Sequence, residues 1–444
     1  MNISGLNIQD QPDTTIYLRI SFEPQVQELK VDLEERRQGE EITLQRYIRT
    51  KVCLTTLQSL SQEIYSILYR STRFSGKSIK GIMESLQQVG RQLYDAVLPL
   101  EIKERLAATG SKNMHLTIDD SLVGIPWELL YDGEEFFCLK FNIGRKVYTQ
   151  HPGIQPKTRD ACRKLKILII ADPRNDLPKS YQEGLLLSRK LETWRDSVEV
   201  YLGTSYIDIK KISREIFHYD IIHYAGHATY NHDKPNLSGW LLEDGIFTAQ
   251  DIIQLSGGKN SFPGLIFSNA CRSGQTSEWS GIEEKNGGVN PYAFDMVNAF
   301  LRCGVKHYIG TFQVIRDLSS HYLASNFYNF MIQSYSIGES LRKARHELIN
   351  QYGNSNLIWA YYMLYGDPTI YYLRPMEKTV RERDKDESVL QIAPPDHHKG
   401  TESLTNRKPI DVHSYSGPHT RNGTNSIMGA LTQNEGAFQG AIHE

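Results

Sequence analysis

Cysteine is scarce in this sequence, and a membrane-spanning apolar run is absent. The chain of 444 residues has only five cysteines: Cys53, Cys138, Cys162, Cys271 and Cys303. Their number is odd and none of them forms a C-x-x-C pair, which excludes the spacing of most zinc sites and of redox dithiols. Sparse cysteine is typical of a reducing compartment. No window holds 18 uninterrupted apolar residues, and the N-terminus lacks a basic segment followed by an apolar one. We therefore expect a cytoplasmic protein without a membrane segment.

An excess of positive charge is also lacking. Lys and Arg number 50 and Asp and Glu number 52, a formal net charge of −2, so we expect no direct nucleic-acid partner. Neither G-x-G-x-x-G nor G-x-x-x-x-G-K-[ST] follows a predicted strand, which argues against nucleotide binding. The C-terminal histidines have irregular spacing, which argues against a metal: His397, His398, His413, His419 and His443. We expect neither a metal nor another cofactor.

Residues 1–110 form the first predicted region. Residues 15–22, TIYLRISF, alternate between apolar and polar side chains as a strand does. Residues 32–70 and 78–110 have a helical pattern, and in the second segment apolar residues recur every three or four positions. The sequence therefore predicts an N-terminal strand followed by a mainly helical region.

Residues 111–375 have a different pattern of apolar residues. Five near-continuous apolar runs are each followed by small or polar residues: LKILIIAD, VEVYLG, DIIHYAG, GLIFSNA and VKHYIGT. Strands buried on both faces of a parallel sheet have this pattern, and helical segments lie among the runs at residues 183–195, 290–304 and 323–353. The prediction is an α/β domain, a doubly wound, mostly parallel sheet flanked by helices. Residues 376–444 are polar and of low complexity, and we expect them to form a flexible tail.

Two of the apolar runs lead to reactive side chains. YDIIHYAGHATYN contains His227 and GLIFSNACRSG contains Cys271, each just past the predicted end of its strand. The carboxyl ends of neighbouring parallel strands meet at one edge of a sheet, where ligands and catalytic groups lie. A nearby imidazole can lower the pKa of a thiol or accept its proton, so the two residues predict a nucleophilic centre. We expect the backbone N–H groups of Cys271 and of a turn at Gly226–Ala228 to support a developing oxyanion.

Plainer interpretations exist for both residues. A lone cysteine after a strand is usually a small buried hydrophobe, and a lone histidine there usually has a structural role. The joint occurrence of Cys271 and His227 supports catalysis more strongly than either residue does alone. His223 is the competing base, but its position inside the apolar run favours a buried, hydrogen-bonded role.

Six ordered blocks within residues 80–373 resemble the CHAT domain, a branch of the caspase-like cysteine peptidases related to separase. The blocks are DIIHYAGHATYN, SGWLLEDGIFTAQDI, LIFSNACRSG, the segment from GGVNPYAF to SNFYNFM, SIGESLRKARHEL and WAYYMLYGDPTI. The resemblance implies a caspase-like sheet with Cys271 as nucleophile and His227 as base and proton donor. The family often has glycine directly after this histidine, where the chain has Ala228. The tetratricopeptide repeats that often accompany the domain are not evident.

The resemblance also implies how such an enzyme selects its substrate and is controlled. Separase-like relatives carry an acidic residue in the pocket for the residue before the scissile bond. Asp317 lies near that position, but the register also admits Val314, so a basic and an apolar preference both stay open. Asp317 is equally placed to cap the helix that follows. The polar, glycine-containing residues 272–290 follow the nucleophile, and we expect a latent form that needs a protein activator or regulator.

The leading interpretation is a cytoplasmic cysteine endopeptidase that hydrolyses a protein substrate. Standalone relatives point by analogy to bacterial antiviral defence or cell death. The alternative is a catalytically inactive caspase-like scaffold that binds partners through the N-terminal region and the tail. The sequence leaves the oligomeric state open.

Overall fold

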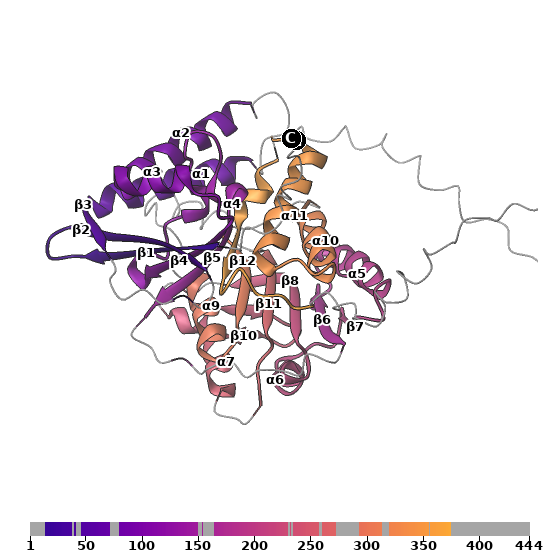
Figure 1. The fold of residues 1–444 in the computed structure, drawn as a ribbon. Helices are drawn as coiled ribbons and strands as arrows, with labels where there is room; N and C mark the ends of the chain where they lie inside the picture. The colour runs from indigo at the N-terminus through magenta and orange to yellow at the C-terminus, as the bar shows by residue number, and fades with distance from the viewer. Residues whose placement is uncertain are drawn as a thin grey trace, which may run out of the picture. The chain divides into compact units, whose positions relative to one another are not determined.

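One hydrogen-bonded sheet runs through the protein (Figure 1). The computed structural model describes residues 14–37, 40, 46–71, 80–149, 153, 164–229, 231, 234–256, 260–271, 293–312, 319–354 and 356–373. Within them, 13 strands pair in the order β10-β9-β8-β11-β12-β13-β5-β4-β1-β2-β3, and β6 pairs with β7 and β8 beside this path. The strands are β1 (Thr14–Glu23), β2 (Glu28–Arg37), β3 (Tyr47–Lys51), β4 (Asn113–Asp119), β5 (Asn142–Tyr148), β6 (Leu165–Ala171), β7 (Val198–Gly203), β8 (Ile221–Thr229), β9 (Gly239–Leu241), β10 (Ile246–Thr248), β11 (Leu265–Cys271), β12 (His307–Thr311) and β13 (Tyr362–Tyr365).

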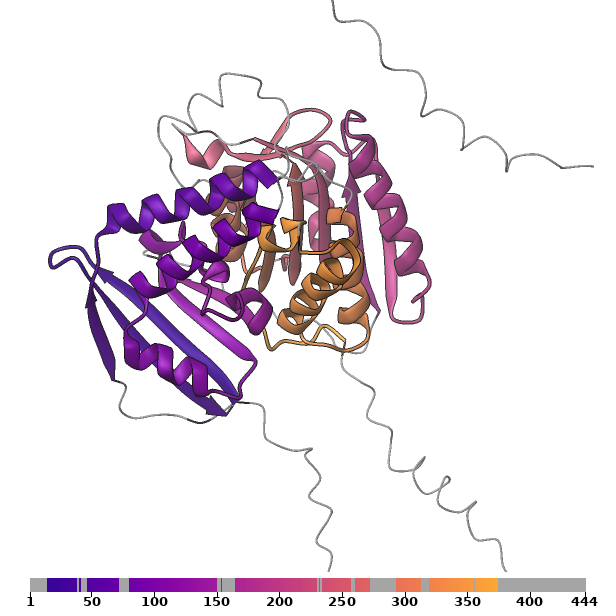
Figure 2. The same ribbon diagram turned by 90° about the horizontal axis from the view of Figure 1, so that it is seen from above.

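Helices pack on both faces of the sheet (Figure 2). On one face, the ring of His223 in β8 lies against Tyr328 of α10. On the other face, Tyr224 stacks on Trp240, and Trp240 contacts Phe300 of α9. The helices are α1 (Leu54–Ser71), α2 (Lys80–Val97), α3 (Leu100–Ala108), α4 (Phe137–Lys140), α5 (Pro178–Glu192), α6 (Ile209–Glu215), α7 (Ala249–Leu255), α9 (Ala293–Arg302), α10 (Ser319–Ile332) and α11 (Ile337–Tyr352).

The five apolar runs form the parallel part of the sheet, as predicted. Neighbours in the order β7-β6-β8-β11-β12 are all parallel. Their side chains are buried where helices cover them, and Ile167, Ile221, Ile222, Leu265 and Ile266 have no exposed surface. Near-continuous burial explains why β6, β8, β11 and β12 read as apolar runs rather than as alternating ones. β7 pairs only with β6 and is largely exposed apart from Val198. The predicted fold class, a mostly parallel sheet flanked by helices, is confirmed.

The N-terminal region differs from its prediction, because β2 and β3 lie in the segment that was expected to begin a helix. In β2 the apolar residues Leu29, Val31 and Leu33 are buried, with Lys30 and Asp32 between them. This period of two is a strand pattern, but the strand continues with EERR, four charged helix formers. β1 pairs antiparallel with β2 and parallel with β4. Strands on both sides of the expected boundary at residue 110 therefore share one sheet.

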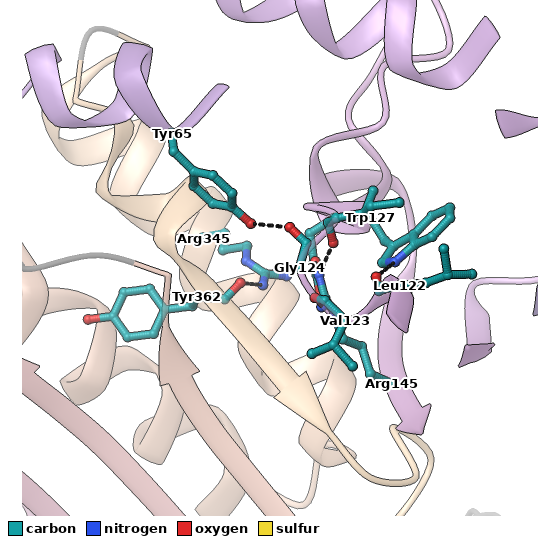
Figure 3. Close-up of polar contacts among 10 residues, drawn as sticks. Tyr65, Leu122, Val123, Gly124, Trp127, Arg145, Arg345 and Tyr362 are labelled. Atoms are coloured by element: carbon teal, nitrogen blue, oxygen red, sulfur yellow. Dashed lines mark hydrogen bonds and ion pairs between the residues drawn. The ribbon is translucent and has the colours of Figure 1, made fainter. Parts of the chain in front are cut away.

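A buried arginine holds the segment after β4 against β5 (Figure 3). Arg145 donates to the carbonyl groups of Val123 and Ile125 at 2.9 and 3.0 Å and to Glu128 Oε1 at 2.7 Å. The Arg145 and Glu128 side chains are 0% and 1% exposed. Because a buried guanidinium needs both a countercharge and hydrogen-bond acceptors, this cluster satisfies it fully.

Candidate active site

The register of two central strands sets Cys271 opposite His227. β8 and β11 are parallel neighbours, paired from Leu265 with Ile221 to Cys271 with His227. Paired residues on neighbouring strands have backbones about 4.8 Å apart. The structure therefore brings the backbones of the two sequence-predicted residues together at the carboxyl end of β11. For Cys271, the structure describes the backbone only.

Cys271 and His227 both belong to their strands, whereas the sequence analysis expected them just past the strand ends. β11 ends at Cys271, and β8 continues two residues beyond His227 to Thr229. The cause is β9, whose residues Trp240 and Gly239 pair antiparallel with Ala228 and Thr229. The expected turn at Gly226–Ala228 is therefore wrong, since this segment is extended strand. That its N–H groups support an oxyanion stays a prediction.

The imidazole of His227 is held by a carboxylate that the sequence analysis missed. His227 Nε2 lies 2.9 Å from Asp176 Oδ1, and His227 is 6% exposed. Because an ionised carboxylate only accepts hydrogen bonds, this contact places the imidazole proton on Nε2. His227 Nδ1 is buried and has no hydrogen-bond partner among the described residues. Nδ1 is therefore the nitrogen left to accept a proton. The signal for Asp176 was its place in LKILIIADPRND, just after a predicted strand.

Asp176 is held in turn by the loop after β6. The carboxylate of Asp172 accepts the backbone N–H groups of Asp176 and Leu177, both at 2.9 Å. Asp172 and Asn175 have φ angles of 49° and 57°, in the left-handed region that Asp and Asn tolerate better than most residues. The N–H of Asp172 donates to the carbonyl of Ala225 in β8 at 2.9 Å. The loop and the histidine strand are thus tied together at two points, Asp172 with Ala225 and Asp176 with His227.

Gly226 makes room for a tyrosine that supports the His227 backbone. The Tyr224 hydroxyl lies 2.5 Å from the carbonyl oxygen of His227 and 3.0 Å from that of Leu241. A Cβ atom at Gly226 would lie 2.7 Å from the Tyr224 hydroxyl oxygen and 3.3 Å from Cδ of Pro173. Those distances are below ordinary van der Waals contact, so glycine at this position has a packing reason.

His223 occupies a buried, hydrogen-bonded position, as predicted. It has no exposed surface, and its Nε2 lies 3.0 Å from Glu183 Oε1. Its ring is also in contact with Phe267 of β11, at 5.1 Å between ring centroids. A fully enclosed imidazole that is bonded to a carboxylate is poorly placed to exchange protons with a substrate, which favours a structural role for His223.

The remaining sequence-predicted features fall outside the described residues. These are the candidate pocket residues Asp317 and Val314, residues 272–290, and the tail of residues 376–444 with its histidines. Among the residues that the structure does describe, no cluster of His, Cys, Asp and Glu could hold a metal ion. None of the described helices has the length and apolar character that a membrane crossing requires.

The fold and the site define an α/β protein with a Cys–His pair at the carboxyl end of its parallel strands. A family model of the CHAT domain matches residues 87–367, and the chain belongs to this family. The resemblance seen in the sequence is thereby confirmed.

Two solved structures are similar to part of the chain and distant from it in sequence. The chain is similar to the crystal structure of the Arg-specific cysteine proteinase gingipain R (RgpB), with 13% identity, a TM-score of 0.45, and coverage of 65% of this chain and 68% of that one. It is also similar to the complex of the Porphyromonas gingivalis RgpB pro- and mature domains, with 13% identity, a TM-score of 0.38, and coverage of 64% and 69%. No curated protein matches the sequence.

Proposed function

We propose that the chain is a cysteine-type endopeptidase that cleaves a protein substrate through Cys271 and His227. The observation that carries this proposal is the strand register that sets Cys271 opposite His227, together with the contact that leaves His227 Nδ1 as the proton acceptor. A thiol beside a base of fixed tautomer has what nucleophilic catalysis needs. Membership of the CHAT family supports the same chemistry.

The reaction is acyl transfer in two halves. The Cys271 thiol gives its proton to His227 Nδ1, and the thiolate attacks the peptide carbonyl carbon. The C–N bond then breaks, and the leaving amine takes the proton from His227. Water, deprotonated by the same imidazole, attacks the thioester and releases the carboxylic acid and the free thiol. Asp176 touches no reacting atom and acts by holding the imidazole. We assign the N–H groups of Cys271 and of Gly226 and Ala228 to the oxyanion that forms in each half.

Finer elements of the proposal draw their support from the sequence alone, from cysteine usage for the compartment and from the resemblance for the rest. The enzyme acts in the cytoplasm in a bacterial antiviral defence or cell-death response. It stays in a low-activity form until a protein activator acts on residues 272–290. Either Asp317 or Val314 shapes the pocket for the residue before the cut, giving a basic or an apolar preference. Full activity of the purified chain as a lone monomer contradicts the latency.

The experiment that tests the proposal is digestion of a proteome-derived peptide library, read by mass spectrometry. Wild type, Cys271→Ala and His227→Ala are compared side by side, with and without a cell extract as a source of activator. Cuts made by wild type and lost in both variants establish the enzyme and give its preference directly. If no cuts are made and Cys271 alkylates no faster in wild type than in His227→Ala, the chain is the inactive scaffold instead.

A further inference from the structure

A buried carboxylate on α5 joins the two strands that carry the Cys–His pair. Glu183 is 5% exposed. Its Oε1 accepts a hydrogen bond from Asn269 Nδ2 of β11 at 2.6 Å and lies 3.0 Å from His223 Nε2 of β8. Its Oε2 accepts from the Ser320 hydroxyl at 3.3 Å. A carboxylate removed from water is costly unless it is hydrogen-bonded, and both oxygens of this one are.

The bonds to Glu183 lie close to the reactive pair along both strands. Asn269 precedes Cys271 by two positions in β11, and His223 precedes His227 by four in β8. The register pairs His223 with Phe267 and Asn269 with Ala225. One oxygen atom therefore bridges β8 and β11 within the same few residue pairs that fix the spacing of Cys271 and His227.

Asn269 is fixed from its other side as well. Its Oδ1 accepts a hydrogen bond from the Tyr362 hydroxyl of β13 at 2.9 Å. The backbone carbonyl of Tyr362 accepts from Arg345 of α11 at 2.8 Å, and in Figure 3 the tyrosine ring points away from that arginine. Arg345 is 1% exposed. With a donor on one side and an acceptor on the other, the Asn269 amide has one orientation.

We propose that Glu183 is a positioning residue for the Cys271–His227 pair and acts through Asn269 and His223. This inference rests on the proposed function, because it assigns Glu183 a part in the same chemistry. A misplacement of about 1 Å between reacting groups can cost on the order of a hundredfold in rate. An apolar contact would hold the strands together but would not set their spacing through one shared acceptor atom.

An exchange of donor and acceptor tests the bridge. Asn269→Asp sets two carboxylates against each other, and Glu183→Gln removes the charge that strengthens both bonds. In the double variant, the new amide at position 183 donates to the new carboxylate at position 269, which still accepts from Tyr362. The second N–H of that amide faces His223 Nε2, so the imidazole carries its proton on Nδ1, toward the Tyr328 hydroxyl, and accepts at Nε2. The net charge of the pair is unchanged, and the directions of both hydrogen bonds are reversed.

The readout is the rate at which iodoacetamide modifies Cys271 in the full chain, in a Cys53→Ser background, measured by peptide mapping. We expect each single variant to slow the modification about tenfold, and the double variant to return to within about threefold of wild type. Asn142→Ala is the matched control. The Asn142 side chain donates to Asn113 Oδ1 of the neighbouring strand at 2.9 Å, far along the same sheet, and its loss leaves the Cys271 rate unchanged.

The outcomes separate this inference from the proposed function. The positioning role is overturned if the folded single variants react at the wild-type rate, or if the double variant is as slow as Asn269→Asp. In either case, slow modification of Cys271 in His227→Ala still upholds the Cys–His pair. Wild-type reactivity in His227→Ala overturns the pair itself. Where peptide cleavage is measurable, the positioning role lowers kcat of the single variants, calculated per folded enzyme molecule, and leaves KM unchanged. A general loss of folded protein lowers the amount of active enzyme instead and leaves that kcat unchanged.

Discussion

His227 Nε2 and Asp176 Oδ1 lie 2.9 Å apart, although the residues come from a strand and from the loop after another strand. The contact decides which ring nitrogen carries the proton, and so it decides which one is left to accept a proton. The Asp176 side chain is 45% exposed. Water can therefore replace the carboxylate in part, which moderates the effect expected from its removal.

Asp176→Ala is expected to lower kcat about ten- to a hundredfold, because the imidazole loses its fixed orientation and tautomer. KM should change little, since the carboxylate faces the histidine and not the substrate. The measurement is steady-state kinetics on a peptide found in the library digestion. The control is Asp196→Ala, which removes an exposed carboxylate after α5. Equal losses in both variants would contradict the role of Asp176.

The sequence predicted the parallel part of the sheet well because strands that are buried on both faces consist of nearly continuous apolar residues, which are visible in the sequence. It misjudged β2, where buried apolar residues alternate with Lys30 and Asp32 and where pairing with β1 overrides the helical preference of the Glu and Arg residues that follow. The two reactive residues were recognisable from their own short segments. Asp176 and Glu183 were not, because Asp176 is 51 residues from its partner His227 and Glu183 is 40 from its partner His223, and only the folded loops and helices bring them together.

Of the cysteines within the described ranges, Cys53 is expected to compete most strongly with Cys271 in an alkylation experiment. It is exposed, and hydrogen bonds with Thr55 and Thr56 at the start of α1 lower its pKa to about 7. Burial raises the pKa of the Cys138 thiol to about 12, so that residue should stay unmodified in the folded protein. Peptide mapping after iodoacetamide treatment across pH 5–9 checks this. A half-maximal rate for Cys53 near pH 8.5, the value of a free cysteine, would count against the hydrogen bonds.

Acidification is expected to destabilise the fold through His307. Complete burial lowers its pKa to about 4 from the ordinary 6.5, and the neutral ring is satisfied by the Tyr372 hydroxyl at 2.8 Å and the Asp367 carbonyl at 3.0 Å. Between pH 6.5 and 4 the unfolded chain binds a proton at this site and the folded chain does not. The free energy of unfolding therefore stays full above pH 6.5 and falls by roughly 3 kcal/mol as the pH drops to 4.

Urea unfolding at several pH values measures this fall. In His307→Gln the amide can still donate to Asp367, but nothing at the position titrates, so the decline with pH should be shallower than in wild type by about that amount. Parallel pH profiles in the two proteins would show that other groups cause the acid sensitivity.

Gly226→Ala tests whether the glycine before the base is there for packing. The new methyl group would lie 2.7 Å from the Tyr224 hydroxyl oxygen, so the tyrosine must move and release the carbonyl of His227. Overpacking of this kind costs about 1–3 kcal/mol of unfolding free energy, and we expect the Cys271 modification rate to fall with it, because the His227 backbone loses its support. Gly81→Ala in α2 is the control, since a Cβ atom there meets nothing within 4 Å and alanine is the better helix former. If urea unfolding shows equal stability for the two variants, the close approach of Tyr224 is not what requires glycine at position 226.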